Sequence, residues 1–310
     1  MKPQVLFLVG PTASGKSKLA MEIARRVKGE IISADSMQVY RGMDIGTAKP
    51  SKADQKKIPH HLIDILSPSR PFSAFEYRKL ALRKIHEVLK RKHLPIVVGG
   101  SGLYVRALLE GFSGHPGASL SIRKKLAREA ETKGLDSLYR RLQDLDPLSA
   151  AKISPKDSRR ILRGLEIFEK SGKKPSDWYQ LQGPLNRNGF QSLVIGIRRD
   201  RAELYEAINQ RVETMVRRGL FREVKRLKKK RLSQTASQAV GYKEILQALG
   251  MDQSVPMILE AIKRNTRRLA KRQGTWFKRE KGIEWILWPS HEDTKVIADK
   301  VIQRIQHAPR

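Results

Sequence analysis

The residue types best suited to chemistry stand near the start of the chain, in a short glycine-rich run. This phosphate loop (residues 10–17) consists of Gly10, Pro11, Thr12, Ala13, Ser14, Gly15, Lys16 and Ser17. It follows the apolar segment 5–9 and precedes the amphipathic segment 19–27, the strand, loop and helix order that cradles phosphate groups. Backbone N–H groups, a helix N-terminus and Lys16 attract an anion, and the Ser17 hydroxyl suits a magnesium ion. An ordinary glycine-rich turn is the alternative.

A carboxylate is expected close to this loop. Asp35 ends a predicted strand over 30–35, and Ser36, Met37 and Gln38 follow it. Ligands of open parallel sheets bind beyond the carboxyl ends of the strands, so Asp35 should face the same crevice as Lys16. An aspartate that only caps a turn is the alternative.

Two more polar residues stand where they could reach the same crevice. Ser101 lies in a second glycine loop (residues 99–102) between a predicted strand and a predicted helix. Its hydroxyl can donate to a phosphate or cap the helix, and spacing alone does not distinguish the two. Arg211 lies at the edge of the apolar stripe of a predicted helix, where it either reaches inward to an anion or stays in solvent.

The charge balance indicates a polyanionic partner. Lys and Arg number 63 against 31 acidic residues, giving a net charge of +32, and such a field attracts nucleic acid. A general lysine bias in composition is the alternative. Between residues 263 and 281, Arg272, Gln273 and Trp276 follow several other basic residues, and Phe277 comes next. Arginine and aromatic side chains on one helix face suit the stacking of unpaired bases.

The apolar pattern predicts an α/β fold: a P-loop parallel sheet flanked by helices, with a small all-α insertion domain. Strands are predicted at 5–9, 30–35, 95–98, 193–197 and 283–288. Helices are predicted at 75–92, 103–109, 121–133, 135–143, 156–170, 203–231 and 257–279. For the 156–170 helix, Ser154 is the predicted N-cap and Pro155 the first helical residue. Loose segments at 111–117 and 171–189 divide the chain into 1–112, 113–189 and 190–310.

Several classes of protein are disfavoured. No apolar run is long enough to span a bilayer, and the first predicted strand begins at residue 5, which leaves no room for a secretory signal. The chain has no cysteine, so disulfides and thiolate metal sites are excluded. His60 and His61 lack a third ligand nearby and are interpreted as structural. We expect a monomeric cytoplasmic protein.

Long motifs in this sequence resemble the tRNA dimethylallyltransferase family, bacterial type. They are GPTASGKS, IISADSMQVYRGMDIGTAKP, HHLID, GGSGLYVRALLEG, SRRILRGLEIF, INQRVETMVRRGL, QAVGYKEIL and RRLAKRQGTWFKR. The resemblance covers essentially the whole chain. It implies transfer of a dimethylallyl group from dimethylallyl diphosphate to the exocyclic amine of the adenine 3′ to the anticodon. The implied product is N6-dimethylallyladenosine, the implied partner the tRNA anticodon stem-loop, and the implied cofactor Mg²⁺.

The same resemblance implies roles for individual residues. Asp35 would be the general base, residues 12–17 would bind the diphosphate, Ser17 would bind Mg²⁺, and Ser101 and Arg211 would steady the reactants. The implied tRNA contacts are Asp35, Ser36, Met37, Gln38, Ser101, Arg123, Arg159, Arg160, Ile161, Leu162, Arg163, Arg272, Gln273 and Trp276. Ser17 and Ser101 stand where threonine is frequent in the family, and Arg159 stands where glutamine is common.

Two other functions remain open at this point. An adenylate isopentenyltransferase would use free AMP, which does not require the basic segments of this chain. A P-loop kinase or a nucleic-acid-binding NTPase would need a strand that ends in a magnesium-binding acid, for which Asp64 is a weak candidate.

Overall fold

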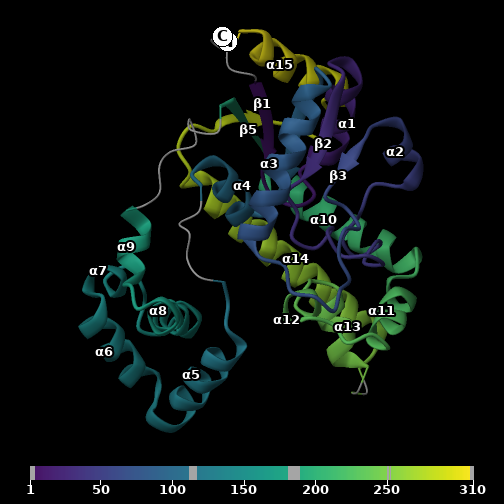
Figure 1. Cartoon of the computed structure of the whole chain (residues 1–310). Helices are drawn as coiled ribbons and strands as arrows, with labels where there is room; N and C mark the ends of the chain where they lie inside the picture. The colour runs from purple at the N-terminus through teal and green to yellow at the C-terminus, as the bar shows by residue number, and fades with distance from the viewer. Residues whose placement is uncertain (1–3, 112–116, 181–188, 250, 252, 308–310) are drawn as a thin grey trace. The chain divides into compact units, whose positions relative to one another are not determined.

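The computed structural model describes residues 4–111, 117–180, 189–249, 251 and 253–307. Its contacts divide the chain into two compact units (Figure 1). The first unit comprises Met1–Leu109 and Asn188–Arg310, and the second is Glu110–Arg187. These limits lie close to the predicted boundaries at residues 113 and 189.

The first unit is built on a six-stranded sheet in the order β3-β2-β4-β1-β5-β6, with every pair of neighbouring strands parallel. The strands are β1 Gln4–Val9, β2 Gly29–Ser33, β3 His60–His61, β4 Leu94–Gly99, β5 Gln191–Arg198 and β6 Glu284–Leu287. Phe7 of the central strand β1 pairs with Val97 on one side and Val194 on the other. The predicted α/β fold is confirmed, and among the strands of the described residues only the two-residue edge strand β3 was not predicted.

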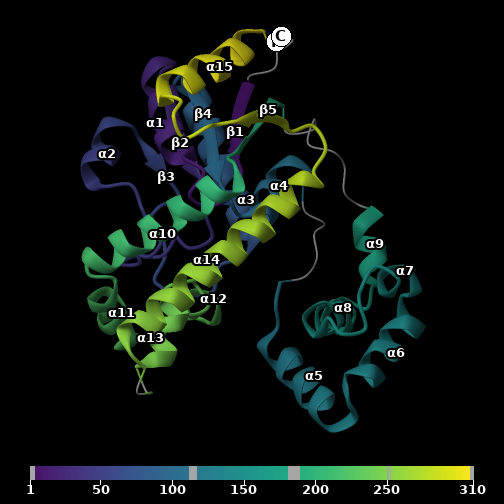
Figure 2. The same cartoon turned by 180° about the vertical axis from the view of Figure 1, so that it is seen from behind.

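Helices cover both faces of this sheet (Figure 2). On one face α1 (Lys16–Arg26) and α15 (Thr294–His307) pack against alternate residues of the strands, among them Leu6 and Leu8. Helix α3 (Ala74–Lys90) packs beside β2 and β4 and contacts α4 (Gly102–Leu109). Such two-sided cover explains why the central strands are continuous apolar runs.

The predicted helix 203–231 is wrong as one element, because the chain turns at Gly219. This glycine has a φ of 97°, which a helix interior does not tolerate. Two helices result, α10 (Arg201–Arg217) and α11 (Leu220–Lys228). With α12 (Gln234–Ser237), α13 (Tyr242–Ala248) and α14 (Val255–Lys278) they enclose a second apolar cluster.

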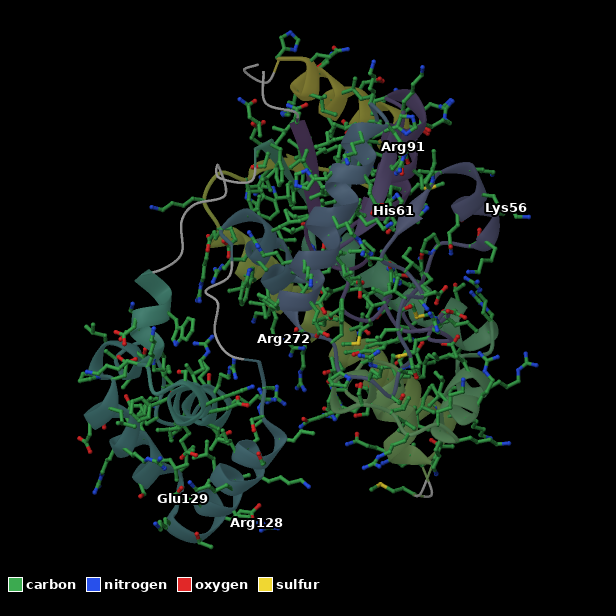
Figure 3. The ribbon with its side chains drawn as sticks, viewed as in Figure 1. Lys56, His61, Arg91, Arg128, Glu129 and Arg272 are labelled. Atoms are coloured by element: carbon green, nitrogen blue, oxygen red, sulfur yellow. The ribbon has the colours of Figure 1, made fainter. Side chains whose placement is uncertain are left out.

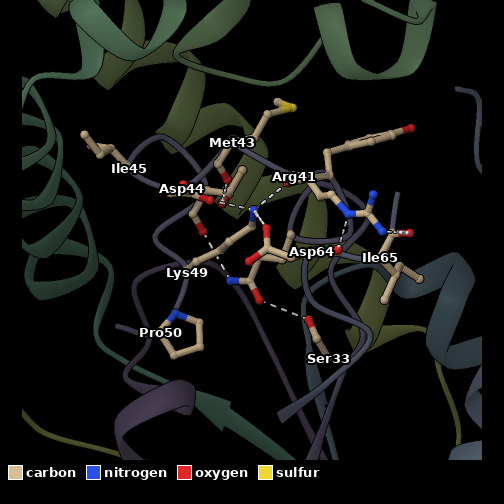
Figure 4. A network of polar contacts seen from close by, with 12 residues as sticks. Ser33, Arg41, Met43, Asp44, Ile45, Lys49, Pro50, Asp64 and Ile65 are labelled. Carbon is tan, nitrogen blue, oxygen red and sulfur yellow. Dashed lines mark hydrogen bonds and ion pairs between the residues drawn. The ribbon is translucent and has the colours of Figure 1, made fainter. Parts of the chain in front are cut away.

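The segment between β2 and α3 contains α2 (Lys52–Lys57) and is fixed by buried polar contacts. The Glu223 carboxylate accepts hydrogen bonds from the backbone N–H groups of residues 44–46, at 2.9–3.2 Å, and from the Tyr242 hydroxyl at 2.6 Å. The Lys49 ammonium donates to Asp44 at 2.8 Å and to Asp64 at 2.5 Å (Figure 4). Asp64, the weak magnesium candidate, is therefore ion-paired within the loop.

The second unit is a helical bundle with its own apolar core. Its helices are α5 Leu120–Lys133, α6 Leu135–Leu145, α7 Pro147–Ala150, α8 Ser158–Ser171 and α9 Pro175–Gln180. The predicted start of α8 is wrong: the Asp157 side chain is the N-cap and accepts from the Arg160 N–H at 3.1 Å. Ser154 and Pro155 precede it in a turn, because an aspartate one step before the helix satisfies its free N–H groups.

Candidate active site

The phosphate loop joins β1 to α1 and requires two glycines. At Gly10 (φ 140°) a Cβ atom would lie 2.4 Å from the Ile197 carbonyl oxygen. At Gly15 (φ 93°) it would lie 2.5 Å from the Trp288 ring. Gly15 is also the N-cap of α1, so the helix N-terminus opens directly at the loop, as anion binding requires.

The Lys16 side chain is buried and folds back over the loop. Its Nζ donates to the Pro11 carbonyl oxygen at 2.5 Å and to the Ser14 hydroxyl at 3.3 Å. Burial, and then the nearby Arg211 guanidinium, lower the pKa of Lys16 to about 7, while Asp35 opposes this shift. Burial also lowers the pKa of Arg211, again against Asp35. Two cations and one acid thus share the site, so its net charge is positive and favours an anionic ligand.

One cavity of about 560 Å³ unites these groups. Of the predicted site residues it is lined by Thr12, Ala13, Ser14, Gly15, Lys16, Ser17, Asp35, Gln38, Arg211 and Gln273. Gly10 and Pro11 are buried, and Ser36, Met37 and Ser101 do not line the cavity. An apolar part of its wall that includes Met21, Ile31 and Ile63 was not predicted. Nothing in the sequence distinguishes these apolar residues of the cavity wall from residues of the hydrophobic core.

Asp35 follows β2 and is held by its own backbone. Its Oδ1 accepts from the N–H of Met37 at 2.8 Å and from that of Gln38 at 3.4 Å. No described residue has a hydrogen bond to Oδ2. The carboxylate therefore keeps one oxygen free, next to the cavity that also contains Lys16.

The Ser101 hydroxyl contacts Ser36 and does not cap α4, while its donation to a phosphate stays a prediction. Its hydroxyl accepts from the Ser36 N–H at 3.0 Å and is 3.3 Å from the Ser36 hydroxyl. Ser101 thus fixes the residue next to Asp35. Gln38 is fixed as well, since its Oε1 accepts from the Ser33 hydroxyl at 3.0 Å and its Nε2 donates to the Thr47 carbonyl oxygen at 3.2 Å.

The predicted stacking platform near the end of α14 is only partly present. Phe277 is fully buried and therefore cannot stack on a base. Trp276 packs against α4, where a Cβ on Gly102 would lie 2.3 Å from its ring, and the Arg106 guanidinium stands 4.6 Å from the ring centroid. Arg272 is exposed (Figure 3). The Trp276 side chain is half-buried, so Arg272 is the most accessible part of the predicted platform.

In the second unit the predicted tRNA-binding side chains differ in availability. Arg159 and Arg160 are exposed. Ile161 is fully buried and Leu162 packs against the same core, so the side chain of Ile161 is not open to RNA. The implied tRNA contact at this position stays a prediction. Residue 161 lies one helical turn before the buried Leu165, so α8 directs both inward.

Arg123 and Arg163 in this unit are engaged by a buried acid. The Glu166 carboxylate accepts from Arg123 Nε at 3.0 Å, from Arg163 Nη1 at 2.7 Å and from the Ser119 N–H at 2.6 Å. These donors lower the pKa of Glu166 although burial opposes the shift. Both arginines therefore help to hold the bundle together.

His60 and His61 form β3, and their side chains have protein partners. His61 Nε2 lies 2.6 Å from the Glu30 carboxylate, and His60 Nδ1 lies 2.7 Å from the Ile58 carbonyl oxygen. Within the described ranges, no group of three His, Asp or Glu residues could hold a metal ion. No helix in those ranges is long and apolar enough to cross a membrane.

A parallel sheet with this loop, a buried lysine and an acid that lines the same cavity has the arrangement of a P-loop enzyme. The model of the family described as IPP transferase matches residues 38–280. A tRNA dimethylallyltransferase of a Thermoanaerobacter species is 44% identical over 98% of both chains, and one of Geobacter metallireducens is 43% identical over 94% of this chain and 95% of that one. The chain belongs to the IPP transferase family.

Solved structures agree with this assignment. A tRNA Δ2-isopentenylpyrophosphate transferase of Staphylococcus epidermidis is 37% identical and aligns with a TM-score of 0.71 over 98% of this chain and 99% of that one. A eukaryotic dimethylallyltransferase acting on tRNA is 28% identical and aligns with a TM-score of 0.83 over 99% of this chain and 80% of that one.

Proposed function

We propose that this protein transfers a dimethylallyl group from dimethylallyl diphosphate to the N6 amine of the adenine 3′ to the anticodon in tRNA. The observation that supports this most is the single cavity in which Lys16 and Arg211 face Asp35. The cations suit the diphosphate and the acid suits an amine that must lose a proton. The names of the related proteins support the choice of substrates.

The residues of the cavity have separate tasks in this reaction. The adenine N6 attacks C1 of the dimethylallyl group, so that the N6–C1 bond forms while the bond between C1 and the diphosphate oxygen breaks. The free Oδ2 of Asp35 accepts the proton that N6 loses. Lys16 and the backbone N–H groups of the phosphate loop stabilise the charge that grows on the leaving diphosphate. The Thr12 N–H is not among them, because it donates to Gln273.

The donor set fits Mg²⁺ as an ion bound mainly by the substrate. Ser17 is exposed, lines the cavity and has no hydrogen bond to another described residue through its hydroxyl. Mg²⁺ commonly takes one or two protein ligands and completes its octahedron with phosphate oxygens and water. When bound, the ion neutralises charge on the diphosphate.

The acceptor must be a base outside a helical stack, because an enzyme cannot reach N6 of a stacked adenine. Arg159, Arg160 and Arg272 are exposed cations suited to the phosphates of an anticodon stem-loop. We expect the protein to act as a monomer. A tRNA substrate indicates the cytoplasm as the place of action.

One labelling experiment tests this function. Dimethylallyl diphosphate labelled in the prenyl group is incubated with unmodified tRNA, with AMP, or with neither, and ATP hydrolysis is followed in parallel. We expect label on the tRNA adenine only. Label on AMP but not on tRNA would indicate an adenylate isopentenyltransferase, and phosphate release from ATP would indicate an NTPase.

A further inference from the structure

Gln273 of α14 connects the two glycine loops of the active site. Its Oε1 accepts a hydrogen bond from the Thr12 N–H at 2.8 Å, and its Nε2 donates to the Gly100 carbonyl oxygen at 3.0 Å. A primary amide can donate and accept at once. Both the oxygen and the nitrogen of the Gln273 amide therefore bond to backbone groups. Thr12 lies 261 residues and Gly100 lies 173 residues from Gln273 in the sequence.

The two loops need such a connection because the sheet ends below them. The last paired residues of β1 and β4 are Val9 and Gly99, and each loop leaves the sheet directly afterwards. Gly100 also makes room for the amide: a Cβ at this position would lie 2.4 Å from Gln273 Nε2.

From Gly100 the contacts continue to Asp35, the proposed general base. The next residue, Ser101, accepts from the Ser36 N–H at 3.0 Å, and Ser36 follows Asp35. A continuous series of contacts thus links the loop that holds the leaving diphosphate to the loop that holds the proton acceptor. Gln273 is the link between them that comes from α14.

We propose that Gln273 is a positioning residue that sets the distance between the phosphate loop and the Asp35 carboxylate. This rests on the proposed function, and it replaces the tRNA contact implied by the resemblance. The diphosphate and the acceptor amine must line up on C1, and a shift of about 1 Å between reacting groups costs about 100-fold in rate.

The first test is Gln273→Met, which keeps the length of the side chain and removes both hydrogen bonds. We expect kcat to fall about 10- to 100-fold, with the KM values for both substrates within about threefold of wild type. Gln273→Glu keeps the acceptor for Thr12 but places an oxygen against the Gly100 carbonyl, so its kcat should also fall. The control is Gln303→Met, the same substitution on the exposed part of α15, which should leave kcat and KM unchanged.

The second test reaches the same contact from the other loop. Gly100→Ala would place a Cβ 2.4 Å from Gln273 Nε2 and 3.2 Å from the Gly10 carbonyl oxygen, which displaces the amide without a substitution in α14. We expect a lower kcat here too. Both substitutions break the same contact, between Gln273 and Gly100. The fall in kcat of the double variant should therefore be smaller than the product of the two single falls.

Three results would overturn this inference in a wild-type enzyme that does modify tRNA. They are an unchanged kcat in Gln273→Met, a raised KM for tRNA at unchanged kcat, and a loss of activity that only follows a lower melting temperature. A wild-type enzyme that leaves tRNA unmodified would contradict the proposed function instead.

Discussion

Two acids mark the two ends of β2, and their surroundings differ. Glu30, at the start of the strand, is buried and accepts from Arg91 at 2.8 and 2.9 Å, with His61 at 2.6 Å and His93 at 2.8 Å. Of these partners, Arg91 and His61 are labelled in Figure 3. Asp35, just after the strand, has backbone donors on one oxygen only. At one end of β2, both oxygens of the Glu30 carboxylate accept hydrogen bonds. At the other end, only one oxygen of Asp35 does.

The difference separates a structural acid from an acid that can accept a proton. Burial opposes ionisation of Glu30, but Arg91, His61 and His93 outweigh it and lower the pKa of Glu30 to about 2. A carboxylate with every lone pair engaged has no place for a new proton. Asp35 offers a free oxygen toward a cavity, which is the property that a general base needs.

After Asp35 itself, the largest effect is expected at Lys16, a cation that serves the reaction rather than the fold. Lys16→Met should lower kcat/KM about 1,000-fold, as for the loss of one strong donor to a developing anion. Because burial lowers the pKa of Lys16 to about 7, its charge costs stability at neutral pH and below. The melting temperature of Lys16→Met should therefore rise. Steady-state kinetics and calorimetry measure both, and a variant that is less stable would contradict the assignment.

Glu30→Gln should have the opposite profile. We expect a loss of about 2–3 kcal/mol in stability, because charged hydrogen bonds to a buried carboxylate disappear. The kcat of the folded variant should stay within about twofold of wild type, since Glu30 lies at the far edge of the sheet from Lys16. Denaturant unfolding measures the stability, and kinetics at denaturant concentrations below the unfolding transition measure kcat. A large fall in kcat with normal stability would contradict the structural role of Glu30.

The pH dependence of stability should carry the signature of Glu30. Its pKa in the folded protein, about 2, lies below its ordinary value of 4.5. The unfolded chain therefore binds the proton first, and the stabilisation present above pH 4.5 is lost as the pH falls toward 2. Melting temperatures between pH 6 and 2.5 should fall more steeply for wild type than for Glu30→Gln. Parallel curves would contradict the role of Glu30.

The smallest effect is expected at Arg91. Its side chain is 46% exposed, so water replaces much of what the ion pair provides. Arg91→Ala should cost less stability than Glu30→Gln, because His61 and His93 still contact the acid. A cost equal to that of Glu30→Gln would show that Arg91 alone stabilises Glu30.

The sequence predicted those parts of the molecule whose pattern is local. Each main strand is an apolar run, and the phosphate loop is contiguous, so both could be placed. The break at Gly219 was predictable from a glycine inside a helical pattern. The burial of Ile161 was also visible in the spacing to Leu165.

Contacts between distant segments could not be predicted. Glu30 meets partners 31, 61 and 63 residues away, and Gln273 reaches loops at 12 and 100. No spacing rule joins such positions, because only the fold brings them together.

The measurement that tests the account most directly is single-turnover prenyl transfer by Asp35→Asn at saturating tRNA and dimethylallyl diphosphate. We expect the rate to fall about 100- to 10,000-fold, as for the loss of a general base, with tRNA affinity nearly unchanged. Normal turnover at saturation together with lost tRNA binding would show that Asp35 docks the tRNA and does not accept the proton.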